Sequence, residues 1–436
     1  MAVNCKAPPP GFACERCAAS DHCSYSVHYT EGSAIQGHVV RDVAHFTRTI
    51  SSKSTIRVDS EAASGGSGAH GSGAVSQEAI STPVFFGCQT LETGMFYKQE
   101  ADGIMGLQPP RARTRVPSML SSLVQSMQAT EAFSLCLADR QGLFLMGGKP
   151  EQAALRARNA LSVPMERNAR ARYTLTLRDV KVSGSGRGNS TFRSLNLPTS
   201  TYAPTLVDSG TTFVYASTPL FRAIHAHVKQ HVPTLQREGG KVCAFLSQAQ
   251  LDAMPNLQFD FAAASKPLLI RAHQYMVEFP RASPITARFG MSAASTKHYC
   301  VAVFDNQRGG TVIGASIMRQ REVIFDIVNS MITFVDADCD KITPATSHLR
   351  DAYAFAPCPP AGSSASATAG RALQGTNHSW NHPAPHVRDG GGGRGATSRH
   401  GGSHFGGKRW SFFHRGHRAG QSRSAQARQA AHEPQL

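Results

Sequence analysis

The sequence lacks any run of about 18 consecutive apolar residues, the length that a helix needs to cross a bilayer. Its first residues, MAVNCKAPPPGF, lack the basic and then apolar pattern of a signal peptide. Charged residues make up only 17% of the chain, whereas hydrophobic residues reach 41%. This balance excludes a chain with membrane-spanning helices and a wholly disordered chain, and it indicates that most of the 436 residues can bury a core.

Acidic residues are also few, because 29 Asp and Glu stand against 45 Lys and Arg, for a net charge of +16. Half of this excess lies in residues 359–436, a Gly- and His-rich segment without apolar periodicity. We expect 359–436 to be a disordered basic tail. Basic and aromatic residues alternate within it at 404–418, a composition that can bind nucleic acid, but a solvated tail is the favoured interpretation.

Ten cysteines stand outside this tail, and an even number fits disulfides formed in an oxidising compartment better than buried free thiols. Four of them are close together at the N-terminus and include one Cys-x-x-Cys. Because no second Cys-x-x-Cys completes a zinc ribbon, we expect no metal, and we expect no cofactor.

Short segments of alternating polarity separated by Gly-rich turns run through most of the chain and predict an all-β architecture. Residues 23–49 predict a hairpin around a Glu-Gly-Ser turn, and residues 60–79 predict a flexible Ser/Gly/Ala-rich insertion. Helical spacing after a proline predicts helices at 117–127 and 219–232. The related strings Ile-Met-Gly at 104–106 and Val-Ile-Gly at 312–314 indicate an internal duplication.

One motif carries the chemistry. Asp208 follows a short apolar strand, and Gly210 after it permits a tight turn. The hydroxyl groups of Ser209, Thr211 and Thr212 can hydrogen-bond the carboxylate and fix its orientation. Alone, an Asp-Ser-Gly string is more typical of a solvated turn than of a catalytic loop, so the motif needs support from the rest of the chain.

That support is a series of segments which, in this order, resemble the pepsin-like aspartic proteases, particularly their Cys-rich plant, algal and protozoan branch. The resemblance covers roughly residues 5–340 and rests on several motifs at once. The segments are Tyr29-Thr-Glu-Gly-Ser33, Phe86-Gly87-Cys88, Ala101-Asp-Gly-Ile-Met-Gly-Leu107, Phe133-Ser-Leu-Cys-Leu137, Val207–Phe213 and Thr311–Gln320.

The resemblance implies a bilobal all-β fold with a peptide-binding cleft between the lobes. We expect a partial N-terminal lobe with the Cys-rich segment and the flap at 1–160, and a C-terminal lobe at 161–358. The flap and substrate cleft would include Tyr29, Glu31, Gly32 and Ser33, and Cys243 and Cys300 would form a disulfide. The implied protein is a monomer that acts on polypeptides.

The resemblance also implies a mechanism in which two carboxylates, one from each lobe, share a proton at acidic pH and activate a water molecule. Asp208 would be one of them. Thr211 would brace its loop against a counterpart in the other lobe.

The sequence departs from the family at one point, because Asp-Ser-Gly or Asp-Thr-Gly occurs only at 208–210. We therefore expect that the chain begins inside the first lobe and is inactive as it stands. A full-length product would be an aspartic endopeptidase of the secretory pathway. A catalytically inactive module that binds peptides or proteins is the alternative, and a polyanion binder acting through the tail is a third hypothesis.

Overall fold

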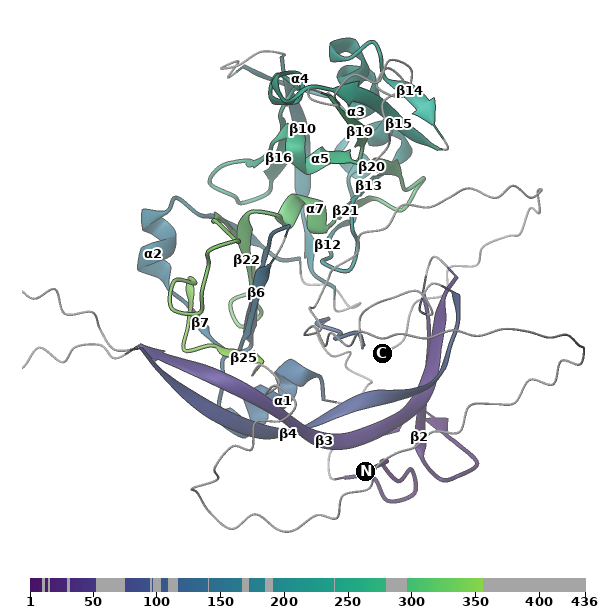
Figure 1. Ribbon diagram of the computed structural model, residues 1–436, viewed down its shortest axis with the longest axis vertical. Coiled ribbons are helices and arrows are strands. Elements are labelled where there is room, and N and C mark those ends of the chain that lie inside the picture. The colour runs from purple at the N-terminus through teal and green to yellow at the C-terminus, as the bar shows by residue number, and fades with distance from the viewer. Residues whose placement is uncertain are drawn as a thin grey trace, which may run out of the picture. The chain divides into compact units, whose positions relative to one another are not determined.

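The computed structural model describes residues 1–9, 12–14, 16–29, 32–51, 75–94, 96, 103–108, 117–139, 141–166, 172–184, 191–238, 240–279 and 296–355. The predicted basic tail lies outside these residues, as does most of the predicted insertion. Strands dominate the described part of the chain, and the fold is all-β, as the sequence predicts (Figure 1).

The largest sheet joins the two halves of the sequence. Strands β5 (Ala132–Leu137) and β22 (Arg321–Asp326) pair antiparallel, with Phe133 opposite Phe325. The rings of these two residues stack with their centroids 4.5 Å apart. In the described part, the strand order of this sheet is β1 (Arg16–Cys17), β2 (Cys23–His28), β3 (Ala34–Ser51), β25 (Tyr353–Phe355), β6 (Gly142–Met146), β5, β22, β23 (Met331–Asp336) and β8 (Leu161–Pro164). Strand β4 (Val75–Glu92) also pairs with β3.

The predicted hairpin at 23–49 is confirmed, since β2 pairs with β3 from Ser24 opposite His38 to His28 opposite Ala34. Strand β3 also pairs with β4, from Ile35 opposite Glu92 to Ser51 opposite Val75, and the two form a long ribbon in Figure 1. Strand β4 begins at Val75, so the prediction of a flexible insertion over 60–79 is wrong for its last five residues. Pairing with β3 extends the strand into these five residues, Val-Ser-Gln-Glu-Ala, despite the weak strand propensity of Gln, Glu and Ala.

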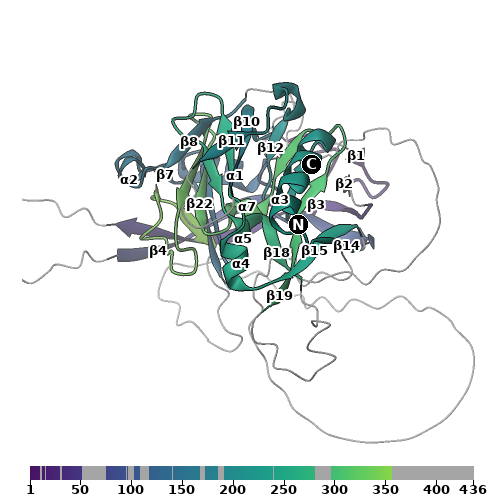
Figure 2. The same cartoon turned by 90° about the horizontal axis from the view of Figure 1, so that it is seen from above.

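Most strands of the second half of the chain belong to smaller sheets, although β8, β22, β23 and β25 belong to the largest one (Figure 2). Among the described residues, one of these sheets contains β20 (Val303–Asp305), β13 (Val214–Ala216), β21 (Thr311–Ile313), β12 (Thr205–Val207) and β9 (Thr174–Leu175). A second contains β11 (Phe192–Ser194), β10 (Leu177–Ser183), β16 (Leu257–Phe261) and β17 (Leu268–Ile270), and a third contains β14 (Gln236–Glu238), β15 (Lys241–Leu246), β19 (Lys297–Val301) and β18 (Met276–Glu278). The fourth is the pair β7 (Lys149–Pro150) and β24 (Leu349–Arg350).

The two predicted helices are confirmed. Helix α1 (Met119–Met127) begins after Ser118, whose hydroxyl accepts a hydrogen bond from the Ser121 amide as an N-cap. Helix α3 (Thr218–His231) buries Leu220, Ile224 and Val228 on one face. The other helices in the described residues are short: α2 (Gln152–Ala157), the 3₁₀ turn η2 (Thr199–Thr201), α4 (Gln248–Asp252), α5 (Ala272–Tyr275) and α7 (Ala315–Met318).

The two strings that suggested a duplication differ in structure. Val312 and Ile313 belong to β21, which pairs with β12 and β13. Residues 104–106 belong to no strand, although Leu107 next to them accepts a hydrogen bond from the Tyr173 hydroxyl at 2.6 Å. The second string forms a strand because β12 and β13 pair with it, and the first has no such partner in the described part of the chain.

Candidate active site

Two parallel strands present Asp208 at their ends. Strand β12 pairs with β21 so that Val207 lies opposite Ile313, and the Asp208 amide continues the ladder by donating to the Ile313 carbonyl at 3.0 Å. The side chains of Val207 and Ile313 are buried, which anchors the point where the chain leaves the sheet. The strand therefore ends at a fixed place, and the half-buried carboxylate follows directly.

Short hydrogen bonds within the loop orient this carboxylate. The Gly210 amide donates to Asp208 Oδ1 at 2.9 Å, and the Thr211 hydroxyl donates to Oδ2 at 2.6 Å. Bonds of this kind to an ionised oxygen are stronger than neutral ones. The Thr211 hydroxyl thus supports the carboxylate within its own loop, and the brace to a counterpart in the other lobe stays a prediction. Ser209 forms the turn with Gly210, and their contribution beyond this geometry stays a prediction.

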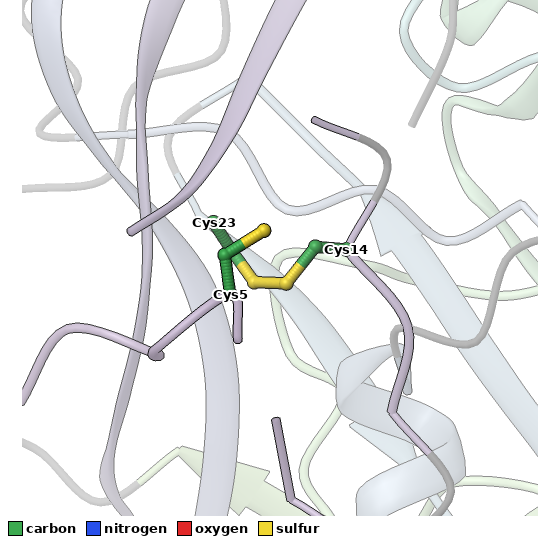
Figure 3. Close-up of side chains that lie close together, drawn as sticks. All are labelled: Cys5, Cys14 and Cys23. Atoms are coloured by element: carbon green, nitrogen blue, oxygen red, sulfur yellow. A yellow bond between two sulfur atoms is a disulfide. The ribbon is translucent and has the colours of Figure 1, made fainter. Parts of the chain in front are cut away.

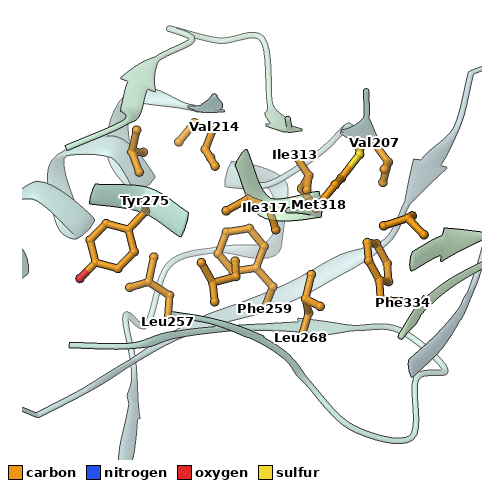
Figure 4. Close-up of a cluster of buried hydrophobic side chains, with 14 of the residues drawn as sticks. Val207, Val214, Leu257, Phe259, Leu268, Tyr275, Ile313, Ile317, Met318 and Phe334 are labelled. Carbon is orange, nitrogen blue, oxygen red and sulfur yellow. The ribbon is translucent and has the colours of Figure 1, made fainter. Parts of the chain in front are cut away.

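The first residues of helix α7 hydrogen-bond to the backbone of the Asp208 loop. The amides of Ala315 and Ser316 donate to the carbonyls of Thr211 and Thr212 at 2.7 and 2.9 Å. Gly314 is required here, because a Cβ on it would lie 2.0 Å from the Phe213 carbonyl oxygen. Apolar side chains hold this arrangement together, with Val207, Ile313, Ile317 and Met318 in one buried cluster (Figure 4).

Sequence reasoning missed the polar residues that support α7. The Ile317 carbonyl at its end accepts hydrogen bonds from Gln274 Nε2 at 3.1 Å and Arg321 Nη1 at 3.0 Å. Arg321 is 3% exposed and also donates through Nε to Asp336 at 2.9 Å. Burial lowers the pKa of Arg321 from its ordinary value, although the Asp336 carboxylate opposes this effect. No motif in the sequence marks these residues, since only the fold brings them to α7.

The flap turn forms as predicted in its backbone. The Tyr29 amide donates to the Ser33 carbonyl at 2.9 Å, and the Gly32 amide donates to the Tyr29 carbonyl at 3.0 Å. Gly32 has φ of 95°, a conformation that favours glycine. The ring of Tyr29 lies 5.1 Å from that of Phe96, Ser33 is buried, and Glu31 lies outside the described residues. The function of these four residues over a substrate stays a prediction.

The Phe86-Gly87-Cys88 segment has a packing reason for its glycine. A Cβ on Gly87 in β4 would lie 2.4 Å from the ring of Tyr25, which comes from β2. Burial raises the pKa of Tyr25 to about 12, with Cys88 and Tyr29 contributing. Gly87 is itself exposed, and its missing side chain leaves room for the buried Tyr25 ring.

A second carboxylate is not hydrogen-bonded to Asp208 among the residues that the structure describes. Asp326 accepts bonds from the amide and the side chain of Asn329 at 3.0 and 2.7 Å, so its part is structural. Asp42 accepts a hydrogen bond from the neighbouring Val43 amide at 2.9 Å. Asp102 lies outside the described residues.

Disulfides take up the sulfur atoms that suggested a zinc site. Figure 3 shows the Cys14–Cys23 disulfide with Cys5 beside it, and Cys5 is itself bonded to Cys17. A disulfide joins Cys243 to Cys300, the pair that the resemblance implies, and another joins Cys136 to Cys339. These thiols are therefore not available as metal ligands. Cys88 is exposed and unbonded, and Cys358 lies outside the described residues.

Known sequences are similar to this one along most of the chain. Residues 2–148 match the family model described as xylanase inhibitor N-terminal, and residues 172–336 match the one described as xylanase inhibitor C-terminal. Aspartic proteinase 39 of Arabidopsis thaliana is 24% identical over 331 residues, and Aspartic protease 5 of Toxoplasma gondii is 23% identical over 333 residues. The chain belongs to the pepsin-like aspartic protease family.

Coverage of these pepsin-like relatives is unequal. The alignments include 74% and 73% of this chain but only 59% of the plant protein and 27% of the Toxoplasma protein. In the part of the chain that the structure describes, no helix has both the length and the apolar character needed to cross a membrane.

Proposed function

We propose that this pepsin-like protein is an aspartic-type endopeptidase in which Asp208 is one of the two carboxylates that activate water. The observation that carries the proposal is the orientation of the Asp208 carboxylate by hydrogen bonds from Gly210 and Thr211. The backbone of this loop is itself hydrogen-bonded to α7 and β21. A solvated Asx turn does not need these additional backbone hydrogen bonds. The arrangement instead fits a carboxylate that must keep one orientation during a reaction.

The mechanism needs a second carboxylate beside Asp208. Two such groups in contact cannot both ionise readily, so at acidic pH they share one proton. The ionised member takes a proton from a bound water molecule as this attacks the peptide carbonyl, and the protonated member stabilises the developing oxyanion. Since the sequence has a single Asp-Ser-Gly loop, we expect the 436-residue chain on its own to be inactive.

An inactive module that binds peptides or proteins is the second candidate. It is favoured by the description of both matching family models as parts of a xylanase inhibitor, and by the single Asp-Ser-Gly loop. In this case the loop around Asp208 would be retained for packing, and a bound partner would not be cleaved.

The remaining assignments belong to the same proposal. Polypeptides are the substrate, the lobes are 1–160 and 161–358, and the protein acts as a monomer without a cofactor. Disulfides bonding eight of the cysteines in the described residues support passage through the secretory pathway, where such bonds persist.

An activity assay separates the two candidates. The 436-residue chain and the native protein isolated from its source are incubated with denatured haemoglobin at about pH 3 to 5. We expect the native protein to cleave, a peptide-mimetic inhibitor of the two-carboxylate site to block this, and the 436-residue chain to be inactive. A native protein that binds the peptide-mimetic inhibitor but does not cleave haemoglobin would favour the binding module.

A further inference from the structure

Helix α3 carries a pair of histidines whose role the proposed function does not explain. His227 and His231 are four residues apart and therefore lie on the same side of the helix. Their rings are in contact, with centroids 4.6 Å apart and planes at 52°. Both are partly exposed, whereas the apolar face of α3, formed by Leu220, Ile224 and Val228, is buried. The pair therefore lies outside the core, at the end of the helix.

One nitrogen of each ring is engaged by a backbone carbonyl. His227 Nε2 lies 2.9 Å from the Ser183 carbonyl oxygen, and His231 Nδ1 lies 2.8 Å from the His227 carbonyl oxygen. A carbonyl only accepts, so each of these nitrogens carries the ring proton. In the neutral rings the lone pairs are then at His227 Nδ1 and His231 Nε2. Metal-binding histidines have this arrangement, because a carbonyl that accepts from the other nitrogen fixes the tautomer and raises the basicity of the ligand atom.

The helix dipole at this position also favours a cation, although Lys229 lies in the same last turn. Helix α3 ends at His231, and the last turn of a helix carries unpaired carbonyls and a partial negative charge. Burial lowers the pKa of His227, and the neighbouring His231 lowers it further, against the effect of the hydrogen bond to Ser183.

We propose that His227 Nδ1 and His231 Nε2 form a two-imidazole chelate for a divalent transition-metal ion, with water completing its coordination. Imidazole nitrogen suits copper, nickel and zinc rather than magnesium or calcium, and copper(II) binds most tightly in this series. This reverses the expectation from the sequence, which considered only cysteine-based zinc and predicted no metal. The inference is independent of the proposed peptidase activity.

His225 provides a matched control on the same helix. Its Nε2 lies 2.9 Å from the Val303 carbonyl oxygen, and its ring is 4.2 Å from that of Phe221, so it faces a different neighbour. Burial lowers its pKa as well. A His225→Ala variant thus removes a half-buried histidine from α3 without touching the proposed chelate.

The test must separate α3 from the other histidines, since 8 of the 19 lie in residues 359–436. The full chain with its disulfides intact receives one equivalent of copper(II) chloride, and paramagnetic broadening of backbone amide signals is mapped by NMR. We expect broadening around residues 227–231 and Ser183. The His227→Ala/His231→Ala variant should lose it and His225→Ala should keep it.

A stability measurement gives a second readout. Excess zinc(II) should raise the melting temperature of the wild type and of His225→Ala relative to EDTA, because a ligand of the folded state stabilises it, but not that of the double variant. If the double variant does not fold, the single variant His231→Gln should weaken copper binding at least about tenfold. Sharp α3 signals in the wild type with copper, or broadening on α3 that persists in the double variant, would overturn the proposal.

Discussion

At the scale of single residues, the site depends on how the Asp208 carboxylate is held. Its two oxygens accept from Gly210 and Thr211, and the main-chain carbonyls of Thr211 and Thr212 are in turn held by α7. The hydroxyl of Thr211 is the group whose loss affects the carboxylate most directly. Its effect on folding is measurable even in a chain without activity.

The substitution Thr211→Val should lower the free energy of unfolding by about 2 kcal/mol, since it removes a hydrogen bond to a charged group. Thr212→Val is the control, because among the described residues Thr212 contributes its main-chain carbonyl to the contacts of the loop. Urea denaturation measures both. Equal losses in the two variants would show that the Thr211 hydroxyl does not stabilise the loop.

A second residue-scale prediction concerns Gly314. In Gly314→Ala the new Cβ would lie 2.0 Å from the Phe213 carbonyl oxygen and 2.5 Å from that of Thr211. Because backbone must move to relieve this contact, we expect a loss of about 3 kcal/mol or more. Gly106→Ala is the control, since nothing lies within 4 Å of its added Cβ. Similar melting temperatures for both variants would contradict the geometry of the loop.

At the scale of elements, the hairpin and two main helices could be predicted from their hydrophobic periods, whereas the attachment of the chain's last strands could not. Strands β24 and β25 pair with β7, β3 and β6, all from the first half of the sequence. The buried side chain of Glu322 on β22 holds the segment just before β24 in place. Its carboxylate accepts from the Ser347 hydroxyl, the His348 amide at 2.9 Å and His348 Nδ1 at 2.6 Å.

Nothing in the sequence around Glu322 marks it as buried, because its partners are 25 and 26 residues away. The same holds for Arg321 and Gln274 beneath α7. Local pattern identifies the Asp208 loop, since strand, carboxylate and turn are contiguous. It cannot identify polar groups whose burial results from tertiary pairing.

The pH dependence of Glu322 follows from its contacts. Burial raises the pKa of this carboxyl, but the hydrogen bonds from His348 and Ser347 outweigh burial and leave the pKa below its ordinary value. A lowered pKa in the folded state stabilises the protein above the unfolded value of about 4.3, and this contribution is lost as the pH falls through the folded value.

Glu322→Gln should therefore destabilise the protein by about 3 kcal/mol at neutral pH. The difference from the wild type should shrink as the pH falls below about 4. Urea denaturation across this range tests it. A difference that is constant with pH, or that grows on acidification, would contradict the assignment of the charged carboxylate.

At the scale of the whole molecule, one disulfide closes the longest loop of the described chain. Cys136 on β5 is bonded to Cys339 after β23, at a sequence separation of 203. Together with the pairing of β5 and β22, it fixes the sheet that both halves share. The sequence predicted disulfides and a bilobal fold, but not this link, because ten cysteines allow many pairings.

Replacing both Cys136 and Cys339 by Ser should lower the free energy of unfolding by about 5 kcal/mol, as expected for so long a loop. Cys88→Ser is the matched control, because Cys88 is exposed and unbonded and its loss should change stability by less than about 0.5 kcal/mol. A double variant as stable as the control would show that this disulfide does not constrain the chain.

The central claim is that Asp208 is one of two carboxylates of a peptidase site and that the 436-residue chain holds a single loop of this kind. The most direct test compares this chain, its Asp208→Asn variant and the native protein for cleavage of denatured haemoglobin at about pH 4. We expect cleavage only by the native protein, with the chain and its variant both at background. A native protein that leaves haemoglobin uncleaved would contradict the assignment of a peptidase site, and cleavage by the 436-residue chain that persists in Asp208→Asn would contradict the role of Asp208.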